Sequence, residues 1–87
     1  MNMKKIFIVL FENVEDIEKI DEDLQAFANE TDAKEYFNSL VKETKKENES
    51  IFEDWEIEED ATSFSAYPDG YYLDTHIDIT LKEIKLN

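Results

Sequence analysis

The sequence predicts an α+β fold in which an antiparallel sheet of three or four strands carries one helix on one face, in the order β-β-α-β-β. An apolar strand pattern opens the chain, one capped amphipathic stripe follows, and a long alternating pattern around a Pro-Gly turn closes it. Elements of these two kinds bury their apolar faces against each other in layers. With 87 residues, we expect a single α+β domain over residues 1–87.

The first strand is predicted over residues 5–11, where apolar side chains fall on both faces. This pattern is typical of a central strand, or of one that is covered on both sides. Residues 12–23 carry seven acids, with apolar residues at three-residue spacing from Val14 to Ile20. This pattern fits a helical turn or a wide loop, and we expect mostly loop there. A short second strand is predicted over residues 24–28.

One helix is predicted over residues 30–47. Asn29 can accept a hydrogen bond from a free amide of the first turn, and Asp32 follows three residues later in a capping-box arrangement. Apolar or small side chains then recur at i, i+4, i+7, i+8 and i+11, which predicts a single buried stripe. The stripe consists of Ala33, Phe37, Leu40, Val41 and Thr44.

A long C-terminal hairpin is predicted, with strands over about 51–66 and 71–86. Its turn is Tyr67-Pro68-Asp69-Gly70-Tyr71, where proline fixes φ and glycine takes the left-handed position. This loop would place Tyr67 opposite Tyr71, so that Ala61 faces Ile77. Apolar residues of both strands then share the odd-numbered face, which we expect the helix to cover.

Composition excludes several functional classes. The chain has 9 basic residues, all lysine, against 23 acidic ones, and its net charge is −14. A protein that binds nucleic acid or an anionic membrane directly needs a basic face, so neither role is expected. Without cysteine there is no disulfide, thiol nucleophile or thiolate metal site. The N-terminal apolar run is too short for a signal peptide or a membrane span, which indicates a cytoplasmic protein.

The even-numbered face of the predicted hairpin is strongly acidic. In the predicted register Asp60 lies directly opposite Asp78, and like charges in that position cost stability. Alternate residues along a strand are roughly 6.6–7 Å apart, a spacing similar to that of phosphates along one nucleic-acid strand. This face would therefore imitate a phosphate backbone, or it is a solvated surface that keeps the protein soluble. Its acids are Glu56, Glu58, Asp60, Asp74 and Asp78.

Two aromatic residues of the same predicted face lie near the hairpin tip. Phe64 and Tyr72 would be exposed beside the carboxylates, where they could anchor a partner, since aromatic residues dominate interface hot spots. Alternatively, the N-terminal segment folds over them. The same pair could also form a self-complementary patch between two copies of the chain.

No catalytic or metal-binding arrangement is predicted. His76 is the single histidine and should lie opposite Thr62, where an exposed residue without function is the favoured interpretation over a general base or ligand. Ser63 and Ser65 point to the other face, so no nucleophile accompanies it. The carboxylates of residues 21–23 and of Asp60 with Asp78 lack the glycine of a calcium loop. We expect no enzyme, no cofactor and no specific metal ion.

Short segments resemble proteins of phages and mobile elements. Ala26-Phe27-Ala28-Asn29, leading into Thr31-Asp32-Ala33-Lys34, is similar to small phage and bacterial proteins with a strand, a capped helix and a hairpin. Glu47-Asn48-Glu49-Ser50-Ile51, Ile79-Thr80-Leu81-Lys82 and Leu86-Asn87 resemble strings in the anti-CRISPR proteins that inhibit Cas9 as DNA mimics. This resemblance implies an inhibitor of a nucleic-acid enzyme in the host cytoplasm, and it carries over no binding residues.

Together these patterns predict a small acidic inhibitor of a basic, nucleic-acid-binding bacterial protein. The expected contact combines the five carboxylates with the two aromatic anchors, and electrostatic attraction would mainly speed association. The alternative is an assembly module that self-associates through its sheet, so the protein is expected as a monomer or a homodimer. A small-molecule or metal binder, or a minimal enzyme, is the third possibility.

Overall fold

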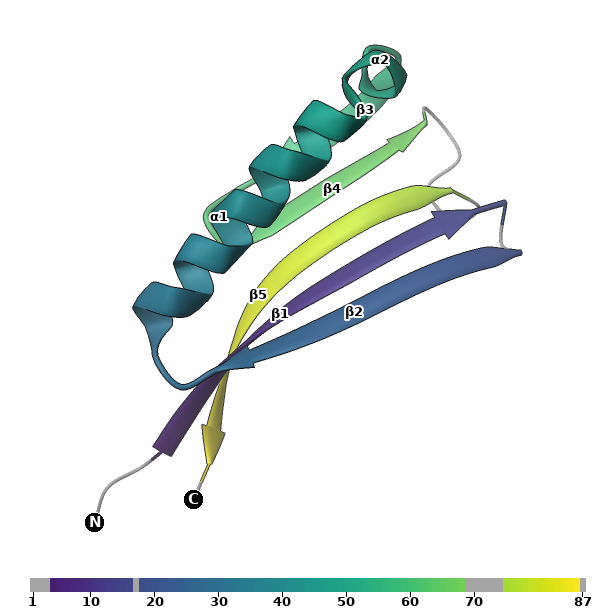
Figure 1. Ribbon diagram of the computed structural model, residues 1–87. Coiled ribbons are helices and arrows are strands. Elements are labelled where there is room, and N and C mark those ends of the chain that lie inside the picture. The colour runs from purple at the N-terminus through teal and green to yellow at the C-terminus, as the bar shows by residue number, and fades with distance from the viewer. Residues whose placement is uncertain (1–3, 17, 69–74, 87) are drawn as a thin grey trace.

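The computed structural model describes residues 4–16, 18–68 and 75–86 (Figure 1). Within these residues, five antiparallel strands form one sheet in the order β2-β1-β5-β4-β3, and two helices follow β2 along the chain. The elements are β1 (Lys4–Glu15), β2 (Lys19–Phe27), α1 (Glu30–Glu47), α2 (Glu49–Phe52), β3 (Trp55–Glu59), β4 (Ser63–Pro68) and β5 (His76–Leu86). None of the helices in these described ranges is long and apolar enough to cross a membrane.

The α+β class is correct in broad terms, but a sheet of three or four strands in the order β-β-α-β-β is wrong. The segment 51–66, predicted as one strand, contains the end of α2, all of β3 and the start of β4. A turn at Asp60 divides it, because the Thr62 amide donates to Asp60 Oδ1 at 2.9 Å. The Asp60 amide in turn donates to the Ser63 carbonyl oxygen at 2.9 Å, which reverses the chain.

The segment 12–23 is a β-hairpin rather than a loop. β1 continues to Glu15 and β2 begins at Lys19, and these two residues lie opposite each other. Asp16 has φ 49°, in the left-handed region that aspartate tolerates better than most side chains. The expectation of a loop is therefore wrong, because residues 12–15 pair with residues 19–22 in an antiparallel ladder.

The register of β5 also differs from the predicted one. In the structure, Phe64 of β4 lies opposite Ile79. The predicted hairpin, with Tyr67 opposite Tyr71, instead required Ala61 to lie opposite Ile77. The other edge of β5 pairs with β1 from Lys4 to Val14, so β5 is an interior strand between β1 and β4 (Figure 1). Residues 69–74, which include the end of the predicted turn and the start of the predicted strand 71–86, lie outside the described part of the chain.

The helix prediction over residues 30–47 is confirmed, because its signals are local. Asn29 Oδ1 accepts from the Asp32 amide at 2.9 Å, and Asn29 Nδ2 donates to Asp32 Oδ2 at 2.9 Å. The buried residues of α1 belong to the predicted stripe, and Leu40 packs against the same core. They are Ala33, Phe37, Val41 and Thr44.

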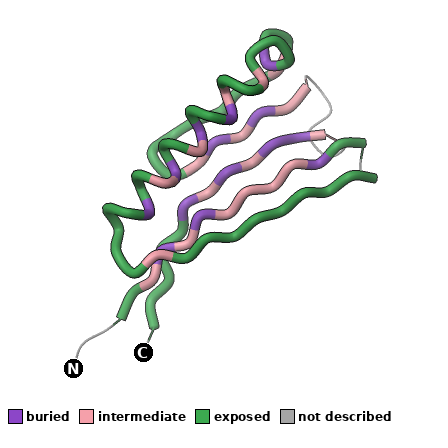
Figure 2. Tube along the Cα trace, viewed as in Figure 1, coloured by how far each residue is buried: buried purple, intermediate pink, exposed green. Residues whose placement is uncertain are grey.

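The core lies between α1 and one face of the sheet, and Phe64, Ile79 and Val9 are its largest fully buried side chains. Figure 2 shows buried stretches on α1 and on the three interior strands, while β2 at the sheet edge is exposed along most of its length. Odd-numbered residues of β1 and β5 enter this core, so even-numbered residues project from the opposite side. We call that opposite side the open face.

Candidate functional site

Four carboxylates line up across the open face. The register places Glu22 of β2 opposite Glu12 of β1, Glu12 opposite Asp78 of β5, Asp78 opposite Ser65 of β4, and Ser65 opposite Glu58 of β3. One side chain from each of the five strands of the described sheet thus forms a line at right angles to the strands. We call Glu22, Glu12, Asp78 and Glu58 the acidic row. Its members on neighbouring strands are separated by the strand spacing of about 4.8 Å.

Apolar side chains flank the acidic row on both sides. On one side of the acidic row, Leu24 of β2 lies opposite Leu10 of β1. On the other side of the row, Ile20 of β2 lies opposite Val14 of β1. Leu24 is 55% exposed and Ile20 is 54% exposed, so the apolar surface reaches solvent at the β2 edge. A shallow groove of about 430 Å³ runs between Leu10 and Leu24 on one side and the row on the other.

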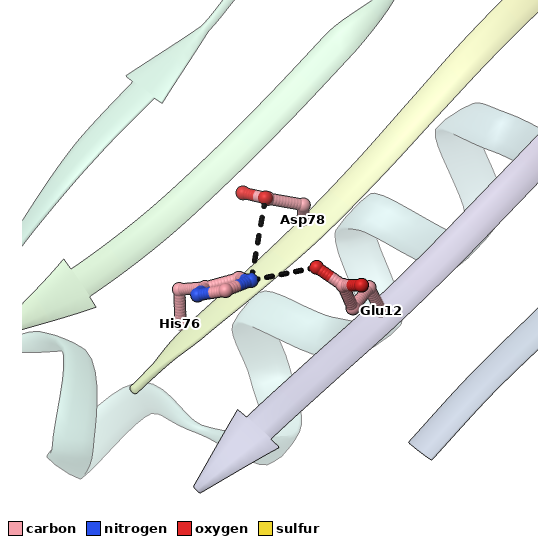
Figure 3. A group of neighbouring side chains, drawn as sticks. All are labelled: Glu12, His76 and Asp78. Atoms are coloured by element: carbon pink, nitrogen blue, oxygen red, sulfur yellow. Dashed lines mark hydrogen bonds and ion pairs between the residues drawn. The ribbon is translucent and has the colours of Figure 1, made fainter. Parts of the chain in front are cut away.

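His76 lies between two carboxylates of the acidic row. Its Nε2 atom is 2.7 Å from Glu12 Oε1 and 3.6 Å from Asp78 Oδ2. Figure 3 shows these three side chains in front of β1 and β5, with α1 behind the sheet. The shorter distance is typical of a charge-assisted hydrogen bond, which offsets the repulsion between the two facing acids.

The expectation of an exposed histidine opposite Thr62 is wrong. His76 lies opposite Val14, and only 8% of the residue is exposed. The cause is the pairing of β5 with β1, which brings Glu12 from 64 residues away to hydrogen-bond distance of the imidazole. The histidine predicted on the surface of a two-stranded hairpin is instead buried in a cluster with Glu12 and Asp78.

Three of the predicted binding acids do lie on the open face. Glu56 and Glu58 are exposed on β3, two residues apart, and Asp78 is partly buried on β5. Glu58 Oε2 accepts a hydrogen bond from the Tyr67 hydroxyl at 2.8 Å, which fixes both side chains on this side of the sheet. Tyr72 and Asp74, the two other predicted residues of the hairpin tip, lie outside the described residues.

Phe64 is not the surface anchor that the sequence predicts, because it is fully buried on the side of α1. Its ring centroid is 6.1 Å from that of Phe52, and Lys45 Nζ lies 5.7 Å from the ring. The Asp60 turn explains the error. After this turn, the even-numbered residues of β4 face α1 and are buried. They lie opposite the odd-numbered residues of β5, which are buried on the same side of the sheet.

Asp60 belongs to a turn and not to the acidic surface of the strands. Asp78 faces Ser65, so the predicted contact of Asp60 with Asp78 does not exist. The Thr62 amide, and next the Ser63 hydroxyl, hold the pKa of Asp60 below its ordinary value of 3.8. These donors favour the ionised carboxylate, so its chemical role is to close the turn between β3 and β4.

This role of Asp60 makes a pH-dependent contribution to stability. Because its pKa is lowered by folding, the contribution is complete above the unfolded pKa and is lost as the pH falls through the folded pKa. Wild type should be more stable than Asp60→Ala at about pH 6, and the difference should shrink below about pH 4. Urea unfolding at low protein concentration measures it; an equal difference at both pH values would contradict this role.

Sequence reasoning missed Glu12, Glu22 and His76 as neighbours. A partial signal was present, because Ile20, Glu22 and Leu24 are spaced by two residues and so share one face of a strand. Leu10, Glu12 and Val14 of the first strand have the same spacing and the same order of apolar and acidic residues. The high acid content of this segment favoured a loop instead.

No family model, no curated protein and no solved structure matches this chain.

Proposed function

We propose that this protein is a non-enzymatic inhibitor that binds a basic surface of a bacterial nucleic-acid-handling protein through its open face. The acidic row is the observation that carries the proposal. Glu22 faces Glu12 and Glu12 faces Asp78, and like charges directly opposite each other destabilise a sheet, a cost that His76 offsets only between Glu12 and Asp78. A basic partner surface would turn this unfavourable arrangement into a favourable one.

The dimensions and charge of the open face suit a nucleic-acid-binding channel. The acidic row crosses five strands, so it extends over roughly 19 Å from Glu22 to Glu58. Proteins that hold nucleic acid line their channels with lysine and arginine to neutralise successive phosphates. A rigid line of carboxylates would compete for such a channel, and the net charge of −14 would speed the encounter.

The apolar residues beside the acidic row would supply contact energy. Leu24 and Ile20 are more than half exposed at the β2 edge, next to Glu22. Buried apolar contacts slow dissociation, whereas charges chiefly set the association rate and the choice of partner. The proposed partner therefore presents apolar side chains alongside its lysines and arginines.

Self-association through the sheet is the second candidate function, and the exposure of Leu24 and Ile20 favours it. Packing two open faces together would, however, bring two acidic rows into one interface. Buried like charges without partners are costly, so we favour the basic partner. Light scattering at high concentration separates the two, because an assembly module would form dimers or larger species.

The binding proposal is tested with two variants that remove equal charge. The face variant carries Glu22→Gln, Glu56→Gln and Glu58→Gln; the helix variant carries Glu35→Gln, Glu43→Gln and Glu47→Gln on exposed positions of α1. Each protein is used as bait in a bacterial lysate, and the captured proteins are identified by mass spectrometry, with and without competing DNA.

We expect wild type and the helix variant to retain the same nucleic-acid-handling protein, and DNA to displace it. The face variant should retain at least about tenfold less, since electrostatic attraction changes association rates by 10–10³. Equal retention by the face and helix variants, or retention that DNA does not affect, would contradict the proposal.

A further inference from the structure

We propose that Glu12, His76 and Asp78 form a binding site for a divalent transition-metal ion, and that Zn²⁺ is the ion their donor atoms fit. This inference goes beyond the inhibitor function and does not depend on it. One imidazole nitrogen and two carboxylate oxygens from adjacent strands all lie within 4.8 Å of one another (Figure 3). Within the described part of the chain, these three residues are the one group of histidine and acidic side chains close enough to share a metal ion.

The sheet holds the three donors in place. Glu12 and Asp78 are direct cross-strand partners on β1 and β5, and His76 precedes Asp78 by two residues on the same face of β5. The side chain of His76 is only 11% exposed and that of Asp78 is 21% exposed. Ligands held on paired strands lose little freedom when an ion binds, so the site is preorganised.

Two of the three distances between donor atoms are already close to those of a metal site, and the third, between Glu12 and Asp78, lies within 4.8 Å. Zinc binds histidine nitrogen and carboxylate oxygen at about 2.0–2.2 Å, so two ligands of a tetrahedral ion lie about 3.4 Å apart. His76 Nε2 and Asp78 Oδ2 are already 3.6 Å apart. Glu12 Oε1, now 2.7 Å from Nε2, has to withdraw by about 0.7 Å. Its side chain is 40% exposed, so it has room to turn.

The donor chemistry selects the class of ion. A nitrogen donor favours zinc and its transition-metal neighbours, whereas calcium and magnesium prefer sites made of oxygen alone. A dication would neutralise both carboxylates and remove the repulsion between Glu12 and Asp78. The groove beside Leu10 and Thr80 is also lined by these two acids.

The first test is a titration of the full chain, stripped of metal by a chelator, with Zn²⁺ in a calorimeter. We expect one saturable ion per chain. His76→Gln and Glu12→Gln should each weaken binding by at least about 100-fold, since losing even an outer-shell partner of a ligand costs 10–100-fold. Glu22→Gln is the matched control, because Glu22 faces Glu12 in the acidic row but is not one of the three donors.

The second test observes the imidazole itself. His76 is the single histidine, so its ring nitrogens give one set of NMR signals, and zinc should shift the Nε2 signal. Calcium takes oxygen ligands, so its affinity should be the same for wild type and His76→Gln. Circular dichroism shows whether His76→Gln folds, and Glu12→Gln at a half-exposed position supplies a second variant if it does not.

The proposal would be overturned by zinc binding of equal strength in wild type, His76→Gln and Glu12→Gln, which would indicate adventitious binding to an acidic surface. An absence of saturable binding, or an unchanged Nε2 signal at saturating zinc, would also overturn it. None of these outcomes depends on a partner protein, so a failure here is distinguishable from a failure of the inhibitor function.

Discussion

Replacing Phe64 by alanine is expected to lower the free energy of unfolding by about 3–5 kcal/mol. The ring is fully buried beneath α1, where it contacts the ring of Phe52 and the Lys45 ammonium group. Deleting it removes buried apolar area and leaves a cavity that the closely packed helix and sheet cannot fill. Urea unfolding followed by far-ultraviolet circular dichroism measures the loss.

The control for this substitution is Ile51→Ala on α2, where the side chain is 52% exposed. It should change the free energy of unfolding by no more than about 1 kcal/mol, as is usual for surface positions. If Phe64→Ala were as mild as Ile51→Ala, Phe64 would lie on the surface. That result would favour the hairpin register that the sequence predicts over the observed one.

Ile79→Ala is expected to cost about 2–5 kcal/mol, because Ile79 is fully buried at the centre of β5. It lies between Phe11 of β1 and Phe64 of β4, so its side chain joins both halves of the sheet to the core. The measurement is again the midpoint and slope of urea unfolding. An unchanged slope shows that the difference lies in stability and not in the compactness of the unfolded chain.

Ile84→Ala is a matched control on the same strand. The residue type and substitution are identical, but Ile84 is 36% exposed and lies opposite Ile6 on the open face. We expect a loss of about 1 kcal/mol, in proportion to the smaller area that it buries. Equal losses at the two positions would contradict the assignment of odd-numbered residues of β5 to the core.

The helix could be predicted from the sequence because its determinants are local. The Asn29 cap, the Asp32 capping partner and the stripe from Ala33 to Thr44 all lie within a single short segment. The apolar run of β1 and the alternation of β5 were equally visible. Strand pairing was not, because it depends on contacts between segments far apart in the chain, and a shift of one residue exchanges the two faces.

Because the turn at Asp60 was not predicted, the candidate site was also predicted incorrectly. Placing residues 51–66 in one strand put Phe64 on the surface and Asp60 beside Asp78. Glu56, Glu58 and Asp78 were nevertheless placed on an outward face, where the structure also has them. His76 and Glu12 could not be joined from the sequence, since 64 residues separate them and only the pairing of β5 with β1 brings them together.

β5 lies between β1 and β4, and that arrangement builds both the core and the acidic row. Backbone nuclear Overhauser contacts in isotope-labelled protein test it most directly. We expect contacts linking β5 to both neighbours, at Ile79 with Phe11 and with Phe64, and at Asp78 with Glu12. Contacts of Ile77 with Ala61, without any between β1 and β5, would contradict it.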